Sequence, residues 1–229
     1  MEPGGLLLGI DTCGPTGSVA LGRLAGRDLE ILSQTELEGR SYSATLVSAV
    51  AELLDRNQIA LRDLGGIVVV NGPGSFTGVR VGLSAVKGLA EPAQIPVVAI
   101  SRLLVLSRKS GVPSCALDAH RGEIFLRTEE QGSAPRELLA GASELASIER
   151  VPLRIAVCDQ AAAALLATAW PGTQLVRTEA PTASDTLRIG EARLVAGGQV
   201  DLALFDGHYL RRSDAEIFGE AAAAGRSRA

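Results

Sequence analysis

The pattern that most constrains the fold of this chain is an apolar strand that ends in an aspartate, turns at a glycine and returns as a second strand. It occurs first in LGIDTCGPTGSVAL and again at mid-chain in CALDAHRGEIFL. Alternating strands and helices follow each copy, and such an arrangement, found twice, indicates two similar lobes. We therefore expect an α/β fold of two lobes, each a mixed sheet with flanking helices.

Hydrophobic periodicity and turn residues place the elements along the chain. Strands are expected at residues 6–11, 18–22, 29–35, 67–71, 95–100, 114–118, 122–128, 153–159 and 175–178, and helices at 41–56, 76–90, 160–169 and 184–196. Ser101 and Ser143 are the expected N-caps of two further helices. We expect an N-terminal lobe over residues 1–103, completed by the tail at 212–229, and a smaller C-terminal lobe over residues 104–211.

Composition limits the classes of partner. The formal net charge is −4 and aromatic residues make up 3% of the chain, so we expect neither a broad basic face for a phosphate backbone nor platforms for base stacking. Any contact with RNA should therefore be indirect. Three widely spaced cysteines fit a reducing compartment. Because we find neither a signal peptide nor an apolar run of membrane-spanning length, we expect a cytoplasmic protein without a membrane partner.

The loop GPGSFTG at residues 72–78 is the sharpest motif, and it lies between an apolar strand and an amphipathic helix. Free N–H groups at a helix N-terminus attract anions, so one interpretation is a cradle for a phosphate or carboxylate. The other is a tight turn in which Ser75 or Thr77 caps the helix. The spacing matches neither a Walker A loop nor G-x-G-x-x-G.

The helix that follows this loop carries Gly78, Gly82 and Gly88, and each glycine in a helix interior costs roughly 1 kcal/mol relative to alanine. Gly78, Gly82 and Ala85 lie on one smooth face that lets another helix or strand approach closely. Together with the apolar stripe of the preceding helix, this face is either a partner-binding surface or ordinary core.

Asp11 and Asp118 end the two repeated strands. In phosphotransferases of the actin/Hsp70 kind an acid at this place holds a hydrated metal, and the turn after it wraps phosphate. Here the first turn contains Pro15, which has no N–H to donate, and the second turn is only residues 119–122. The alternative is that both aspartates simply cap their turns.

His120 and His208 are isolated, with no H-x-x-x-H motif and no Cys/His cluster, so we expect neither a metal site nor a serine or cysteine triad. The charged segment at residues 209–216 is either a docking or positioning element or a solvated helix start capped by Ser213.

At these residues the chain resembles the TsaB (YeaZ) family. The matching segments are GIDT…GSVAL, NGPGSFTGVRVGLS, ALDAHRGEIF and HYLRRSDAE, which occur in the family's order over nearly the full length. The run GPGSFTG-x-R-x-G is the most specific of them. Residues 132–150 match the family poorly, so their structure is left open.

The resemblance implies two actin/Hsp70-like lobes (the ASKHA, or RNase H-like, class) and a pseudo-enzyme without cofactor or metal. TsaB-like proteins are paralogues of the catalytic subunit TsaD and bind it through their first two long helices, and the ATPase TsaE joins the assembly. The implied role is a non-catalytic scaffold or activator of threonylcarbamoyl transfer to the adenosine beside the tRNA anticodon. Alone, such a chain can form a homodimer.

Carried over onto this sequence, the resemblance assigns two sets of residues. One departure is Tyr42, where family members often have a histidine. The implied partner interface comprises Tyr42, Leu46, Val50, Leu53, Gly78, Arg80, Gly82, Ser84 and Lys87. The implied vestigial phosphate-loop positions are Asp11, Thr12, Asp118 and Gly122.

Two other functions compete with this role. The first is an ATP-dependent phosphotransferase that uses Asp11 and Asp118 around Mg-ATP, which predicts nucleotide binding by the isolated chain. The second is a metallopeptidase, which requires metal ligands that two isolated histidines do not supply.

Overall fold

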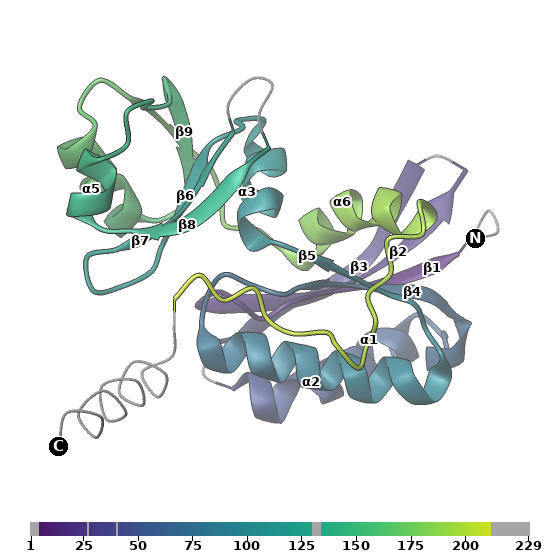
Figure 1. Ribbon diagram of the computed structural model, residues 1–229. Helices are drawn as coiled ribbons and strands as arrows, with labels where there is room; N and C mark the ends of the chain where they lie inside the picture. The colour runs from purple at the N-terminus through teal and green to yellow at the C-terminus, as the bar shows by residue number, and fades with distance from the viewer. Residues whose placement is uncertain (1–4, 27, 40, 130–133, 212–229) are drawn as a thin grey trace, which may run out of the picture.

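The computed structural model describes residues 5–26, 28–39, 41–129 and 134–211. Figure 1 shows two lobes, and each is built on its own five-stranded sheet. Three clusters of buried apolar side chains fill the interior, the largest of them around the first sheet. The two-lobed α/β architecture predicted from the repeated strand pattern is therefore confirmed.

The first sheet has the strand order β3-β2-β1-β4-β5. β1 pairs antiparallel with β2 and β2 with β3, whereas β1, β4 and β5 are parallel neighbours. β1 and β4 are nearly continuous apolar runs, as expected of strands that are covered on both faces. The bounds are β1 Leu6–Asp11, β2 Thr16–Ala25, β3 Asp28–Glu38, β4 Leu64–Val70 and β5 Val97–Ile100.

The second sheet repeats this plan with the order β10-β9-β6-β7-β8. β6 pairs antiparallel with β7 and β7 with β8, and β6, β9 and β10 are parallel neighbours. This repeated topology defines the actin/Hsp70-like, or RNase H-like, fold class. The bounds are β6 Cys115–Asp118, β7 Ile124–Thr128, β8 Arg136–Ala140, β9 Arg154–Val157 and β10 Gln174–Arg177.

Helices cover the first sheet on both faces (Figure 1). The helices α1 (Tyr42–Arg56) and α2 (Phe76–Ala93) lie side by side on one face, and α6 (Ala183–Val195) lies on the other. α3 (Arg102–Ser110) contacts both α6 and the second sheet, and α4 (Ala142–Ala146) packs against α5 (Gln160–Ala169) in the second lobe. The 3-10 turn η1 spans Leu61–Asp63. Within the described ranges no helix combines the length and apolarity that a membrane span requires.

The position of α6 changes the expected division into lobes. A Cβ atom added to Gly190 would lie 2.1 Å from Val68 on β4, and one added to Gly9 on β1 would lie 2.7 Å from Leu187. The chain after α6 also returns to this lobe, because the N–H of Val200 donates to the carbonyl of Val97 at 2.9 Å. Residues 183–207 therefore pack against the first sheet, although the range 104–211 had placed them in the second lobe. The tail at 212–229 lies outside the described residues.

Of the two expected helix caps, one is confirmed in position and one is corrected. Ser101 is the N-cap residue of α3, but its side chain makes no capping hydrogen bond, because its hydroxyl donates to Glu137 Oε2 at 2.6 Å. The N-cap of α4 is Gly141, not Ser143. The contact of Ser101 with Glu137 is tertiary and cannot be predicted from the local sequence.

Candidate inter-lobe site

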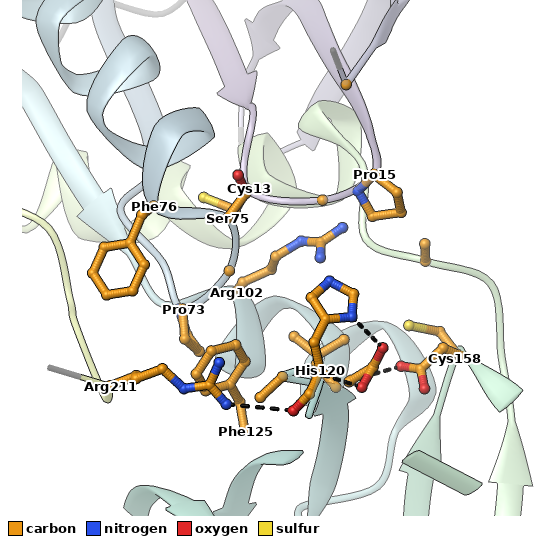
Figure 2. A pocket seen from close by; sticks show the side chains of 18 residues that line it. Cys13, Pro15, Pro73, Ser75, Phe76, Arg102, His120, Phe125, Cys158 and Arg211 are labelled. Carbon is orange, nitrogen blue, oxygen red and sulfur yellow. Dashed lines mark hydrogen bonds and ion pairs between the residues drawn. The ribbon is translucent and has the colours of Figure 1, made fainter. Parts of the chain in front are cut away.

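A cavity of about 610 Å³ lies between the two lobes (Figure 2). Its first wall is the β1–β2 turn together with the GPGSFTG loop, and its second wall is the β6–β7 turn with the start of α5. Its volume lies within the range of small-molecule sites. The charged or aromatic side chains that line it are Phe76, Arg102, Asp118, His120, Phe125, Asp159 and Arg211.

The GPGSFTG loop acts as a tight turn. Ser75 is the N-cap of α2, because its hydroxyl accepts a hydrogen bond from the N–H of Gly78 at 3.3 Å. The N–H of Ser75 donates to the carbonyl of Cys13 at 2.9 Å. A Cβ atom on Gly74 would lie 2.2 Å from that same carbonyl oxygen. The capped-turn interpretation is thus correct, and the loop's close approach is to the chain's own β1–β2 turn.

Asp11 is buried and already paired with a cation. Its Oδ1 accepts from the N–H of Cys13 at 2.8 Å, and its Oδ2 accepts from Arg102 Nε at 3.2 Å. The exposed fractions are 6% for the Arg102 side chain and 1% for that of Asp11. Burial acts to lower the pKa of Arg102, but the charge and hydrogen bond of Asp11, together with Cys13 and Cys158, raise that pKa overall, so the guanidinium stays charged.

Asp118 is a turn cap at the equivalent strand end of the second lobe. Its Oδ1 accepts from the N–H of His120 at 2.8 Å, and its Oδ2 lies 2.9 Å from His120 Nδ1. The turn is tight, because His120, Arg121 and Gly122 all have positive φ angles between 58° and 77°. Asp159 fixes the strand end by accepting from the N–H of Asp118 at 2.9 Å.

These contacts do not fit a magnesium–nucleotide site. The acid that would hold a hydrated metal, Asp11, is paired with Arg102, and Asp118 is engaged by its own turn. Pro15 removes one N–H from the first turn. Across the residues that the structure describes, no group of three or more His, Cys, Asp or Glu side chains could hold a metal ion.

The cavity's two cysteines are neutral thiols. Burial, and then the charge of Asp11, raises the pKa of Cys13 well above its usual value. Its Sγ donates to the carbonyl of Val70 at 3.4 Å. Burial likewise raises the pKa of Cys158. Because the thiolate is the nucleophilic form, this environment disfavours thiol catalysis.

The expected partner interface on α1 is corrected by burial. Tyr42, Leu46, Val50 and Leu53 are at most 3% exposed and belong to the first lobe's core. The hydroxyl of Tyr42 donates to the carbonyl of Gly14 at 2.8 Å, so this residue supports the β1–β2 turn from beneath. An apolar stripe has the same spacing whether it meets a sheet or a partner, and here the sheet accounts for it.

Two residues of the smooth face of α2, Gly78 and Gly82, also turn inward. The hydroxyl of Thr12 donates to the carbonyl of Gly78 at 2.7 Å, and a Cβ atom on Gly82 would lie 2.4 Å from that hydroxyl oxygen. Gly78 and Gly82 thus let the end of β1 approach the helix, which assigns them to the core. Thr12 is fully buried and serves this packing rather than the cavity.

The remaining predicted interface residues lie near the surface of α2. Arg80 and Ser84 are exposed, and Lys87 is half-buried. The Arg80 guanidinium lies 5.9 Å from the ring centroids of Phe76 and Tyr209, which stack at 5.2 Å. Both cations therefore contact aromatic rings of the chain, since Lys87 lies 5.9 Å from the Phe205 ring.

Residues 208–211 connect the lobes, which supports a positioning role within the chain. The N–H of His208 donates to the carbonyl of Asn71 at 2.7 Å in the first lobe, and its Nε2 lies 2.9 Å from Glu137 Oε2 in the second. Arg211 pairs with Glu123 and donates to the carbonyl of His120 at 3.4 Å. Ser213, the alternative helix cap, lies outside the described residues.

Sequence reasoning missed Arg102 and Glu137, the two charged residues that organise the region between the lobes. Arg102 pairs with an acid 91 positions earlier in the chain. The carboxylate of Glu137 forms hydrogen bonds with Ser101, Arg127 and His208. No local motif marks either residue, because each acts through partners that only the tertiary fold brings together.

The fold and the inter-lobe cavity together define the class of protein: a two-lobed member of the actin/Hsp70-like group. Residues 30–145 match the family model TsaD, described as tRNA N6-adenosine threonylcarbamoyltransferase. That match spans half of the chain, so the chain belongs to the TsaD family, and the known proteins that it resembles include TsaB, or YeaZ, proteins.

Curated relatives match roughly half of the chain. The TsaB protein of Escherichia coli K12 is 33% identical over 125 residues, and that of Bacillus subtilis 168 is 37% identical over 123 residues. Each match covers 52% of this chain and 52% of the relative, so the chain spans about half the length of the curated relatives it matches. Both relatives are called tRNA threonylcarbamoyladenosine biosynthesis proteins.

Solved structures match over most of the chain. A Pseudomonas aeruginosa protein described as similar to peptidase YEAZ is 26% identical, with a TM-score of 0.72 over 90% of this chain and 100% of that one. A second structure, YeaZ from the same organism, is 25% identical with a TM-score of 0.69 and the same coverage. The likeness therefore includes both lobes.

Proposed function

We propose that this chain is a non-catalytic subunit in tRNA threonylcarbamoyladenosine biosynthesis, acting as a scaffold or activator of a TsaD-like transferase. The names of its relatives support the pathway. The observation that carries the non-catalytic role is the buried Asp11–Arg102 pair, because it engages the acid that the fold would use to hold a metal. Under this proposal the protein works in the cytoplasm, a TsaE-like ATPase joins the assembly, and tRNA is bound through the partner.

The surface that would receive the TsaD-like partner is the outward side of α1 and α2. On each helix four small or apolar residues recur at offsets 0, 3, 4 and 7, which makes one stripe along the helix. All but Val81 and Ala85, which are half-buried, are exposed. These residues are Ala44, Val47, Ser48 and Ala51 on α1, and Val81, Ser84, Ala85 and Gly88 on α2.

Two adjacent stripes of small side chains let a second helical pair approach closely. The apolar side chain of Val47 is 56% exposed, so it is not part of the chain's own core. A homodimer through the same stripes is the expected assembly when the partner is absent. This surface replaces the inward-facing residues that the sequence had indicated.

Reconstitution tests the proposed function. Purified TsaC-, TsaD- and TsaE-like proteins of the same organism are incubated with tRNA, threonine, bicarbonate and ATP, with and without this chain, and threonylcarbamoyladenosine is quantified by mass spectrometry. We expect product only when the chain is present. An equal rate in its absence would refute the proposal.

The phosphotransferase alternative is tested on the isolated chain. It requires Mg-ATP binding that depends on Asp11, whereas the pairing with Arg102 disfavours such binding. Calorimetric titration of the chain with Mg-ATP distinguishes the two, and binding that Asp11→Asn abolishes would favour the alternative.

A further inference from the structure

Arg102 offers unused hydrogen-bond donors to the inter-lobe cavity. Its Nε is taken by Asp11, but among the described residues neither terminal Nη atom has a hydrogen-bond partner. The side chain is only 6% exposed, and it lines the cavity. Figure 2 shows the guanidinium pointing into the space between Pro15 and His120. The terminal nitrogens of Arg102 can therefore donate to an acceptor that is bound in the cavity.

The geometry of these donors favours a carboxylate. The terminal edge of a guanidinium matches two planar oxygens, and such bidentate pairs are among the strongest hydrogen-bonded contacts in proteins. The oxygens of a phosphate ester match the same edge of the guanidinium. The charge around the cavity therefore has to decide between a carboxylate and a phosphate ligand.

The charge around the cavity argues against a polyphosphate. Two arginines line it, and each is already paired with a carboxylate, Arg102 with Asp11 and Arg211 with Glu123. The second wall adds Asp118 and Asp159, which makes four carboxylates against two guanidinium groups. A multiply charged anion would be repelled here, whereas a ligand that also carries a positive charge would be attracted.

The two walls therefore differ in the charge of the groups that still have free hydrogen-bonding sites. Arg102 offers donors from the side of the first lobe, and Asp118 and Asp159 retain free acceptor sites on the second, since a carboxylate has about four lone-pair sites. Apolar surface lies beside both, from Phe76, Phe125 and two prolines.

We propose that the inter-lobe cavity binds a small zwitterion, an α-amino acid or an equivalent amino carboxylate with a large apolar side chain. Its carboxylate binds the Nη edge of Arg102, its ammonium faces Asp118 and Asp159, and its side chain packs on Phe76 and Phe125. This site lies between the lobes, at the ends of β1 and β4, whereas the proposed partner surface is the outward side of α1 and α2.

The test titrates the full chain with four probes and follows binding by calorimetry and by NMR of the Arg102 Nε–H signal. The probes are L-phenylalanine, 3-phenylpropanoate, which lacks the ammonium, 2-phenylethylamine, which lacks the carboxylate, and Mg-ATP. We expect L-phenylalanine to bind roughly 10-fold or more tightly than either single-ended analogue and to shift the Arg102 signal. Equal binding of an analogue, tighter binding of Mg-ATP, or no binding of L-phenylalanine would overturn the proposal.

Two variants locate the binding site. In Asp11→Asn/Arg102→Gln the guanidinium is removed without leaving a buried lone charge, and we expect a loss of affinity of about 10- to 100-fold. Ala180 lines the cavity and is exposed, so Ala180→Trp should block binding without disturbing the ion pair. Ala167→Trp, at an exposed position on α5 outside the cavity, is the matched control. Unchanged affinity in both cavity variants would refute the site.

Discussion

Arg102 Nε and Asp11 Oδ2 lie 3.2 Å apart, with both side chains almost completely buried, at the point where the first lobe faces the cavity. Removing one partner of such a pair leaves the other charge buried without a counter-ion. Asp11→Asn or Arg102→Leu should therefore each lower the free energy of unfolding by about 3–5 kcal/mol. Urea denaturation followed by circular dichroism measures both.

The double variant Asp11→Asn/Arg102→Leu tests whether the loss comes from the pair itself. Because neither charge remains, its destabilisation should fall short of the sum of the single variants by about 1 kcal/mol or more. Strict additivity would mean that the two residues do not depend on each other.

Gly82 and Gly88 of α2 form a matched pair for testing which glycine is core. A methyl group at Gly82 would meet the Thr12 hydroxyl at 2.4 Å, whereas nothing lies within 4 Å of one at Gly88. We expect Gly82→Ala to destabilise the protein by about 1–3 kcal/mol through overpacking. Gly88→Ala should stabilise it by roughly 1 kcal/mol, because alanine is the better helix former. Denaturant midpoints of the two variants should move in opposite directions.

A variant of Val47, on the outward stripe of α1, tests the proposed partner surface. Val47→Asp should leave the thermal midpoint within a few degrees of that of the wild type, because the side chain is 56% exposed. It should weaken binding to the TsaD-like subunit by roughly 10-fold or more, as expected for a charge buried without a partner at an interface. Val195→Asp on α6, at a residue that is 61% exposed, is the control and should bind normally. Equal binding by both variants would place the interface elsewhere.

The ionisation of Glu137 makes the free energy of unfolding depend on pH. Burial opposes its ionisation, but hydrogen bonds from His208, Ser101 and Arg127 outweigh burial and lower its pKa below the usual 4.5. A carboxyl group with a lowered pKa in the folded state stabilises the protein above the unfolded-state pKa, and this contribution is lost as the pH falls through the folded-state pKa. The wild type should therefore lose more stability between about pH 5 and pH 3 than Glu137→Gln does. Parallel curves for the two proteins would contradict this assignment.

The elements that local pattern determines were predicted well. α5 was placed at residues 160–169 as observed, and α6 began and ended within one residue of its expected bounds. The two Asp-ending hairpins were also correct, because alternation and turn residues specify them locally. β8, at Arg136–Ala140, went unpredicted, since its short and partly charged sequence becomes a strand only beside β7.

What the sequence could not supply is the side on which each element packs. The stripe of Leu46, Val50 and Leu53 has the same spacing whether it meets a sheet or a partner. α6 was found as a helix, but nothing in its sequence says that it covers the first sheet rather than the second. Arg102 lay outside every motif because its partner is distant in sequence.

The return of α6 to the first sheet has a consequence for synthesis on the ribosome. β5 ends at Ile100 and α6 ends at Val195, so about 95 further residues must emerge before the second face of the first sheet is covered. At typical elongation rates of about 5–20 residues per second, this takes roughly 5–20 s. During that interval the nascent chain exposes the apolar surface around Val68 that α6 later covers, and this is the stage at which it most depends on chaperones.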